Sequence, residues 1–215
     1  MDTNPIIEML GRPLRLAVIG GGPGSFIGAM HRTAARLDGR YQLVAGVVST
    51  DPQRSRSAAI GFGIDPGRAY TDAMAMLDAE QALDDGAEVV AIMTPNDSHH
   101  RYAIAALDRG FDVICDKPMT NALEEALDIV AAVDRSGLTF ALTHNYTGYP
   151  MVRQARALVE AGEVGEIRLV QVEYVQGGKA DEVDPDPADG LPWRYDAVRG
   201  GPSLVMGDIG THAHN

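Results

Sequence analysis

The 215-residue sequence lacks several features, and each absence argues against a class of protein. Its single cysteine, Cys115, cannot form a disulfide framework and is typical of a protein from a reducing compartment. No apolar run approaches the roughly 18 residues of a membrane-spanning helix, and the first residues do not resemble a signal peptide. Basic residues are scarce, 18 against 30 acidic ones, so neither nucleic acid nor an anionic membrane is expected as a partner. We therefore expect a soluble, cytoplasmic protein.

The sequence does contain a regular alternation of short apolar runs with amphipathic or alanine-rich segments. The apolar runs predict five strands, at Leu14–Ile19, Tyr41–Val48, Glu88–Met93, Phe111–Cys115 and Leu138–Leu142. The intervening segments predict helices at about residues 25–38, 52–60, 72–83, 98–109 and 121–136. Apolar strands in β-α alternation indicate an α/β fold, a Rossmann-type doubly wound parallel sheet. Ligands of such sheets bind at the carboxyl ends of the strands.

The fifth predicted helix has clear signals at both ends. Asn121 and Glu124 have the spacing of a capping box, and Gly137 is a plausible end. Three apolar residues recur on one side at helical spacing: Leu123, Leu127 and Val130. We expect this side of the helix to pack against another element.

The second part of the chain has a different character. Residues 150–162 predict a helix with proline in its first turn, and residues 167–176 mix polar and apolar side chains as a half-exposed, antiparallel strand does. Residues 177–190 are acidic and rich in glycine and proline, which predicts a loop. One strand cannot form a stable sheet. We therefore expect residues 1–146 to form one domain and residues 147–215 to begin a second, which they do not complete.

A glycine cluster follows the first predicted strand and opens the first helix. Gly20, Gly22 and Gly28 would let the backbone turn tightly and approach a pyrophosphate, whose charge the amides of the helix N-terminus would meet. The loop is longer than the usual G-x-G-x-x-G. A glycine-rich turn without a ligand is the alternative, but the position after the first strand favours a dinucleotide.

The end of the second predicted strand should select between NAD and NADP. Ser49 and Thr50 stand where an NAD enzyme usually has a carboxylate, and Arg54 follows one turn later. Two hydroxyls and a guanidinium suit a 2′-phosphate, so NADP is favoured. In the alternative reading, Thr50 and Asp51 cap the next helix and Arg54 is a solvated surface residue.

The third predicted strand ends at the sequence TPNDSHH. Pro95 and Asn96 would lie at the cofactor edge of the sheet, with His99 just inside the next helix, which Asp97 or Ser98 can cap. His99 and its neighbour His100 would point about 100° apart on a helix and so would not chelate one ion. We expect no metal site here.

The fourth predicted strand ends in Asp116, Lys117 and Pro118. Lys117 would reach the position at which a nicotinamide ring lies, and the proline would fix the turn, for which a cis bond is one route. A structural lysine at a strand end is the alternative.

Near the end of the chain, Asp208 and His212 are four residues apart. On an α-helix this spacing stacks the two side chains on one face, where the acid can orient the imidazole and hold its pKa at or somewhat above about 6.5. A capping aspartate beside a packed histidine is the alternative.

Four motifs occur together in the order and at the separations of a known family. They are G-x-x-H at 28–31, T-P-N-x-x-H at 94–99, D-K-P at 116–118 and G-D-x-x-x-H at 207–212. The sequence resembles the glucose–fructose oxidoreductase / inositol dehydrogenase family (Gfo/Idh/MocA). It departs from the pattern where Asp116 replaces the usual glutamate of E-K-P, in the longer glycine loop, and in ending where family members continue.

The resemblance implies a Rossmann domain followed by an α/β domain with an open, mostly antiparallel sheet that commonly mediates homo-oligomers. It further implies NAD(P) as cofactor, a sugar or polyol as substrate, and Lys117, Asp208 and His212 as catalytic residues. Lys117 would bind the substrate hydroxyl, His212 would take its proton, and Asp208 would orient His212. Some relatives instead use NAD for redox-assisted glycosidic cleavage, and others are regulatory proteins without catalysis. The presence of all three residues argues only against the regulatory reading.

Overall fold

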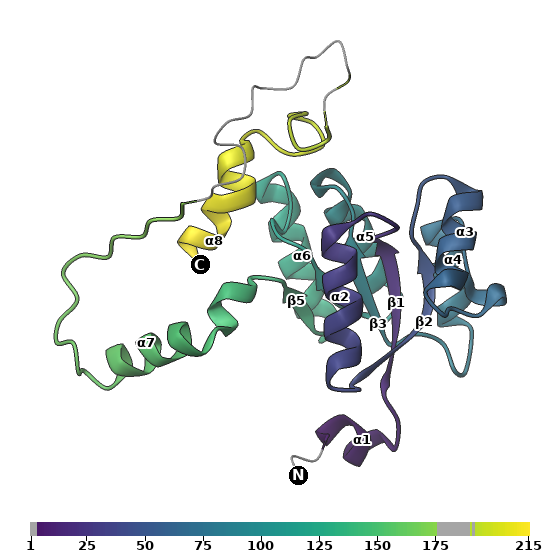
Figure 1. The fold of residues 1–215 in the computed structure, drawn as a ribbon, viewed down its shortest axis with the longest axis horizontal. Helices are drawn as coiled ribbons and strands as arrows, with labels where there is room; N and C mark the ends of the chain where they lie inside the picture. The colour runs from purple at the N-terminus through teal and green to yellow at the C-terminus, as the bar shows by residue number, and fades with distance from the viewer. Residues whose placement is uncertain (1–3, 176–189, 191) are drawn as a thin grey trace.

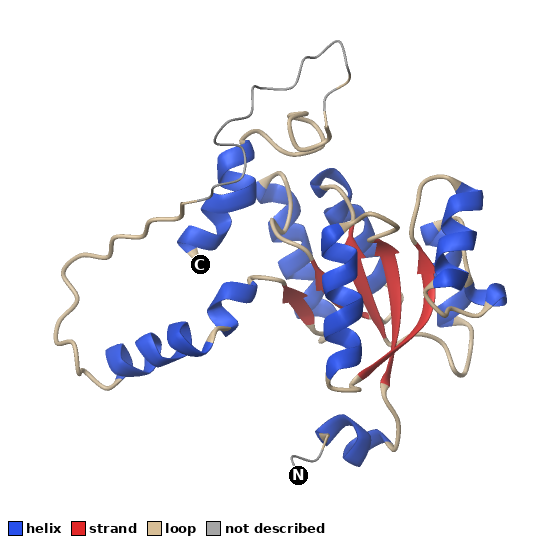
Figure 2. Cartoon of the chain, in the orientation of Figure 1, coloured by secondary structure: helices blue, strands red, loops and turns tan. Residues whose placement is uncertain are grey.

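A computed structural model describes residues 4–175, 190 and 192–215 of the chain. Its centre is a five-stranded, wholly parallel sheet with the strand order β2-β1-β3-β4-β5 (Figures 1 and 2). The strands are β1 (Leu14–Gly20), β2 (Tyr41–Val47), β3 (Val89–Met93), β4 (Asp112–Cys115) and β5 (Phe140–Leu142). The predicted parallel sheet is confirmed.

Helices follow or connect these strands as the alternation predicted. They are α2 (Phe26–Leu37), α3 (Pro52–Gly61), α4 (Ala73–Gln81), α5 (His99–Leu107), α6 (Leu123–Ser136), α7 (Pro150–Glu160) and α8 (Thr211–His214). A further short helix, α1 (Pro5–Leu10), was not predicted; the side chain of Asn4 caps its first turn.

The sheet has an apolar core on each face, because successive residues of a strand point to opposite sides. Leu16 and Val18 of β1 belong to the cluster on the α2 and α3 side, whereas Ala17 and Ile19 belong to the cluster that α4, α5 and α6 cover. All residues of the central strand β3 are buried. This packing on both faces is the doubly wound arrangement that the sequence predicted.

The strand order places a topological switch point between β1 and β3, at the carboxyl edge of the sheet. β1 pairs with β2 on one side and with β3 on the other, so the connections that leave β1 and β3 run to opposite faces. The glycine loop after β1 therefore lies at the point where open α/β sheets bind their ligands.

Two expected helix caps are not formed. Asn121 is not the cap of α6, whose N-cap residue Ala122 makes no side-chain bond; the side-chain amide of Asn121 donates to the carbonyl of Val198. Likewise Ser98 makes no cap bond for α5; its hydroxyl lies 2.7 Å from Thr94 Oγ1 and 2.8 Å from the carbonyl oxygen of Pro95. Both side chains are used in tertiary contacts or loop turns that local spacing does not reveal. The predicted end of α6 at Gly137, in the left-handed conformation, is confirmed.

The apolar side of α6 formed by Leu123, Leu127 and Val130 was expected to pack, and this expectation is wrong. All three side chains are exposed, while Ile129 and Ala132 are buried against the sheet. Helical neighbours are about 100° apart, so α6 has two apolar stripes and the sheet covers only one.

The second part of the chain matches the prediction in its helix and differs in its strand. α7 begins at Pro150 as expected. Residues 167–176 were expected to form a strand. The structure describes 167–175 of these, and they pair with no strand in the described part of the chain, whereas a strand needs a partner for its backbone groups. The predicted loop at 177–190 lies outside the described residues except for Gly190. The division into domains after residue 146 stays a prediction.

No helix within residues 4–175, 190 and 192–215 is long and apolar enough to cross a membrane.

Candidate active site

Lys117 stands on the turn that follows β4, at the carboxyl edge of the sheet. The Lys117–Pro118 peptide bond is cis. Behind the turn, the fully buried ring of His99 lies 2.8 Å from the carbonyl of Pro118 through Nδ1 and 2.9 Å from the carbonyl of Thr94 through Nε2. His99 therefore joins the loops that follow β3 and β4. Both of its nitrogens are occupied by the chain itself.

The C-terminal segment lies against these two loops (Figure 1). The side-chain amide of Asn96 donates to the carbonyl of Gly200 at 2.9 Å, and the backbone amide of Asp97 donates to the carbonyl of Arg199 at 3.0 Å. Asn121 adds its bond to Val198 at 3.1 Å. These contacts bring residues about one hundred positions apart in sequence to the same edge of the sheet.

Lys117 pairs with Asp208, which belongs to this C-terminal segment. The Lys117 ammonium donates to Asp208 Oδ1 at 2.6 Å and to the carbonyl oxygen of the same residue at 2.7 Å. We expected Asp208 to orient His212, but its carboxylate binds Lys117. The reason is local: residues Met206–Gly210 form a π-helical turn, in which residues four apart do not stack as they do on an α-helix.

His212 lies among aromatic rings from the loop after β5. Its ring centroid is 4.4 Å from that of Tyr146 and 5.8 Å from that of His144. His212 Nδ1 and His144 Nε2 are buried and have no hydrogen-bond partner among the described residues. Buried nitrogens of this kind are normally satisfied, so two unpaired ones beside a lysine are consistent with a site for a hydroxyl-bearing molecule.

The electrostatic surroundings favour neutral imidazoles. Burial lowers the pKa of His212 below its usual 6.5, the ammonium of Lys117 and the ring of His144 lower it further, and Asp208 opposes them only in part. Burial and Lys117 likewise lower the pKa of His144. The expected His212 pKa at or somewhat above 6.5 is therefore wrong in direction, because the carboxylate that should have raised it is bound to Lys117.

Tyr146 connects the cluster of His212 and His144 to Tyr174, in the segment that follows α7. Its hydroxyl lies 2.7 Å from the hydroxyl of Tyr174, and the two rings stack. This hydrogen bond, with burial, raises the pKa of Tyr146 to about 12. Tyr146 therefore remains protonated at neutral pH.

The glycine loop is shaped by close backbone approaches. A Cβ atom at Gly22 would lie 2.0 Å from the carbonyl oxygen of Val48, and one at Gly28 would lie 2.1 Å from that of Gly21. The side chain of Ser25 caps α2 by accepting from the amide of Gly28 at 3.1 Å. The loop therefore packs directly against the end of β2 and the start of α2, with no room for a side chain at Gly22 or Gly28. This arrangement is compatible with a bound dinucleotide.

The contacts after the end of β2 show the role of Asp51. Asp51 caps α3, its carboxylate accepting from the amide of Arg54 at 2.6 Å, and Ser49 Oγ accepts from the amide of Asp51 at 3.1 Å. The guanidinium of Arg54 donates to the carbonyl of Pro23 at 3.2 Å, across to the glycine loop. Thr50 is exposed beside them. The capping alternative is confirmed for Asp51, and Arg54 lies against the loop rather than free in solvent.

The predicted cofactor residues all follow strands at the carboxyl edge, but they are not equally available. The glycines lie in or next to the loop after β1, and beside it lie Ser49, Thr50 and Arg54, which follow β2. Pro95 follows β3, and Lys117 follows β4. Asn96 and His99 are buried and bound to backbone carbonyls.

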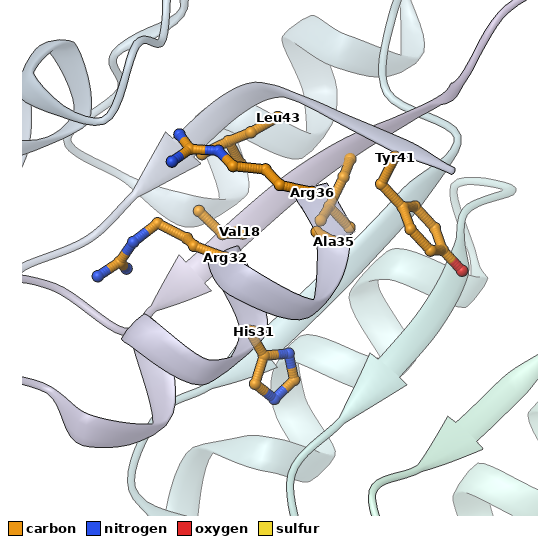
Figure 3. Close-up of a pocket in the computed structure, with 8 residues that line it drawn as sticks. Val18, His31, Arg32, Ala35, Arg36, Tyr41 and Leu43 are labelled. Atoms are coloured by element: carbon orange, nitrogen blue, oxygen red, sulfur yellow. The ribbon is translucent and has the colours of Figure 1, made fainter. Parts of the chain in front are cut away.

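A small crevice elsewhere in the domain is a packing gap (Figure 3). It lies between α2 and the strands β1 and β2, and its lining residues are Leu16, Val18, His31, Arg32, Ala35, Arg36, Tyr41 and Leu43. In the part of the chain that the structure describes, no group of three or more acidic, histidine or cysteine side chains could hold a metal ion.

Comparison with protein families agrees with this geometry. The family described as "Oxidoreductase family, NAD-binding Rossmann fold" (GFO_IDH_MocA) matches residues 14–157. The chain belongs to the Gfo/Idh/MocA oxidoreductase family. The family's C-terminal domain matches residues 152–215, which include Asp208 and His212.

Individual Gfo/Idh/MocA relatives match nearly the whole chain. The uncharacterized oxidoreductase YfiI of Bacillus subtilis (strain 168) is 36% identical over 208 residues, covering 96% of this chain and 53% of the relative. Levoglucosan dehydrogenase of Pseudarthrobacter phenanthrenivorans is 30% identical over 206 residues, 93% of this chain and 49% of that protein. The crystal structure of an inositol dehydrogenase homologue from Azotobacter vinelandii, complexed with NAD+, superposes with a TM-score of 0.87 at 37% identity, covering 94% of this chain and 52% of that one. The chain thus spans about half the length of the curated relatives it matches.

Sequence reasoning missed His144 and Tyr146. A signal was available, because both follow the last strand of the same parallel sheet, whose carboxyl end meets the edge that carries Lys117. The same rule identified the polar residues after the third predicted strand, but it was not applied to the residues after the fifth.

Proposed function

We propose that this protein transfers a hydride between a nicotinamide cofactor and a hydroxyl-bearing carbon of a sugar or polyol. The observation that carries the proposal is the placement of the Lys117 ammonium and the neutral, unpaired His212 on the same edge of the sheet as the glycine loop. A cation and a base converge there, which is what removal of a hydroxyl proton requires. Relatives named as levoglucosan and inositol dehydrogenases support the substrate class.

The side chains divide the work of handling the hydroxyl group. Lys117 binds the substrate oxygen and stabilises negative charge on it. His212 accepts the hydroxyl proton, and its lowered pKa keeps it able to do so at neutral pH. Asp208 holds the ammonium of Lys117 in position and offers its second carboxylate oxygen to a substrate hydroxyl. A bound NAD(P) would supply the hydride acceptor, held by Gly20, Gly22, Gly28 and the α2 amides.

The experiment for this proposal replaces Lys117 by alanine in the full-length protein. Turnover of sugars and polyols, followed by the absorbance of the reduced nicotinamide, should fall at least about a hundredfold. Cofactor affinity should stay nearly unchanged, which also shows that the variant is folded. A variant with near-normal turnover would return Lys117 to a structural role, and release of an aglycone without net cofactor reduction would favour redox-assisted glycoside cleavage.

We further propose that the cofactor is NADP. Asp51 is turned toward the amides of α3, so Arg54, Ser49 and Thr50 remain to meet a 2′-phosphate. A charge-assisted contact contributes about 1.5–3 kcal/mol, roughly ten- to a hundredfold in affinity.

Arg54→Ala should therefore weaken NADP+ binding by about that factor and leave NAD+ binding unchanged. Isothermal titration calorimetry of both cofactors measures this, and Arg56→Ala on the same helix is the matched control. Equal losses for both cofactors, or a wild type that prefers NAD+, would refute the assignment.

The location and assembly of the protein are also proposals. The buried free thiol of Cys115 supports a cytoplasmic location, where thiols stay reduced. Exposed apolar residues on α7 and on the segment after it support a homo-oligomer that forms through the second domain.

A further inference from the structure

The side chain of Asp116 lies at a junction of three elements. A single oxygen, Oδ1, is 2.8 Å from His31 Nε2 and accepts from the hydroxyl of Thr143 at 3.0 Å. Asp116 is only 9% exposed, and a carboxylate is an acceptor alone, so His31 donates through Nε2. The contacts join α2, the end of β4 and the end of β5.

Each of these three elements supports one part of the proposed site. His31 belongs to α2, the helix that the glycine loop opens, and Figure 3 shows its ring projecting from α2 on the side away from Leu43. Asp116 immediately precedes Lys117 in the chain. Thr143 immediately precedes His144, whose ring packs against His212. One buried carboxylate therefore connects the cofactor helix with both strand ends that carry the polar groups.

Backbone bonds at the same point show that the junction is continuous with the sheet. The amide of Asp116 donates to the carbonyl of Ile92 at 3.0 Å, and the amide of Thr143 donates to the carbonyl of Cys115 at 3.0 Å. These backbone bonds extend the ladder of the sheet by one step, to the two residues whose side chains meet at the junction.

We propose that Asp116 is a positioning residue for hydride transfer, which fixes Lys117 and His144 relative to α2 through His31 and Thr143. The proposal rests on the function proposed above. Reactive groups that are misplaced by about 1 Å can cost about a hundredfold in rate while binding is retained. A charge-assisted contact to two donors on different elements restricts such displacement.

The same strand offers a matched control at its opposite end. The carboxylate of Asp112, at the start of β4, accepts from the backbone amide of Thr139 at 2.7 Å and also ties β4 to the segment that leads into β5. It lies at the amino edge of the sheet, away from the proposed site. Asp112 therefore stabilises the connection between β4 and β5, as Asp116 does, but it positions no residue of the proposed site.

The experiment compares Asp116→Asn with Asp112→Asn in the full-length protein. Asp116→Asn should lower kcat about ten- to a hundredfold and change KM and cofactor affinity by less than about threefold. Asp112→Asn should leave kcat within about threefold of wild type at a similar loss of thermal stability. Asp116→Glu, which keeps the charge, should recover most of kcat.

Amide hydrogen exchange of the cofactor-free protein gives a second readout that does not depend on turnover. Asp116→Asn should speed exchange at the amides of Asp116 and Thr143 about tenfold, while Asp112→Asn should do so at Val113, which is bonded to Thr139.

The outcomes separate the two proposals. A wild type that never reduces or oxidises a nicotinamide contradicts the proposed function, whatever the exchange rates. A working wild type in which Asp116→Asn loses no more kcat than Asp112→Asn, or in which Asp116→Glu is as slow as Asp116→Asn, contradicts the positioning role alone. Unchanged exchange at Thr143 in Asp116→Asn also contradicts it.

Discussion

At the scale of single residues, the site depends on which carboxylate meets which cation. Asp208 was expected to serve His212, yet it binds the ammonium of Lys117 at 2.6 Å. This leaves His212 with burial and a nearby positive charge as the main influences on its pKa, and both disfavour the imidazolium. His212 is therefore better prepared to accept a proton at neutral pH than its sequence spacing suggested.

The sign of the His212 pKa shift predicts a pH profile. A general base acts only when it is neutral, so oxidation should rise with pH through an apparent pKa below about 6.5 and be level above it. His212→Asn should lose this step, and His100→Asn, a histidine of α5 outside the cluster, should keep it. Initial rates of substrate oxidation across the pH range measure both. A midpoint above about 7, or a step that persists in His212→Asn, would identify another group as the base.

At the scale of elements, one buried acid holds α4 to the loops around it. The Glu80 side chain is 1% exposed. Its carboxylate accepts from both the Nε and Nη2 groups of Arg68, from the hydroxyl of Tyr70 at 3.0 Å and from the amide of Ala87 at 2.9 Å. These donors precede and follow α4, so Glu80 fixes both connections of the helix between β2 and β3.

Removal of that carboxylate should be costly. Glu80→Ala leaves the largely buried guanidinium of Arg68 without its main partner and should lower the free energy of unfolding by about 3–5 kcal/mol. Asp78→Ala on the same helix breaks an exposed pair with Arg109 and should lower it by less than about 1 kcal/mol. Urea unfolding followed by circular dichroism gives both values. Similar losses in the two variants would show that Glu80 has no special role.

At the scale of the whole molecule, much apolar surface is left uncovered beyond the sheet. Exposed apolar side chains occur along α7 and the segment after it: Met151, Val152, Val159, Val164, Ile167, Leu169, Val170, Val172 and Val175. Figure 2 shows this part of the chain extending away from the helices and strands of the sheet. Exposed apolar side chains in this number predict an interface.

The 215-residue chain should consequently self-associate in solution. Leu169→Lys combined with Val170→Lys should weaken association, because charges on an unpaired segment oppose strand pairing. Leu37→Lys, at an isolated exposed leucine that ends α2, is the control and should leave association unchanged. Sedimentation velocity over a range of concentrations tests this. A wild-type chain that stays monomeric throughout would contradict the prediction.

The sequence by itself determined the Rossmann part of the molecule. β-branched runs that alternate with amphipathic segments can bury their apolar residues only as parallel strands with helices on both faces. The same pattern placed the glycine loop, the Arg54 region and Lys117 on one edge, because the carboxyl ends of parallel strands converge. Local signals with a local cause, such as the end of α6 at Gly137, were also readable.

Only the tertiary structure decided the partners of the polar side chains. Asn121 had a capping pattern but bonds to Val198, and Asp208 had a pairing pattern but bonds to Lys117, and both partners come from segments distant in sequence. The contacts of His144 with His212 and of His31 with Asp116 were likewise decided only by the packing of distant segments. Hydrophobic periodicity is a property of one segment, whereas a hydrogen bond between two segments exists only after both have been packed.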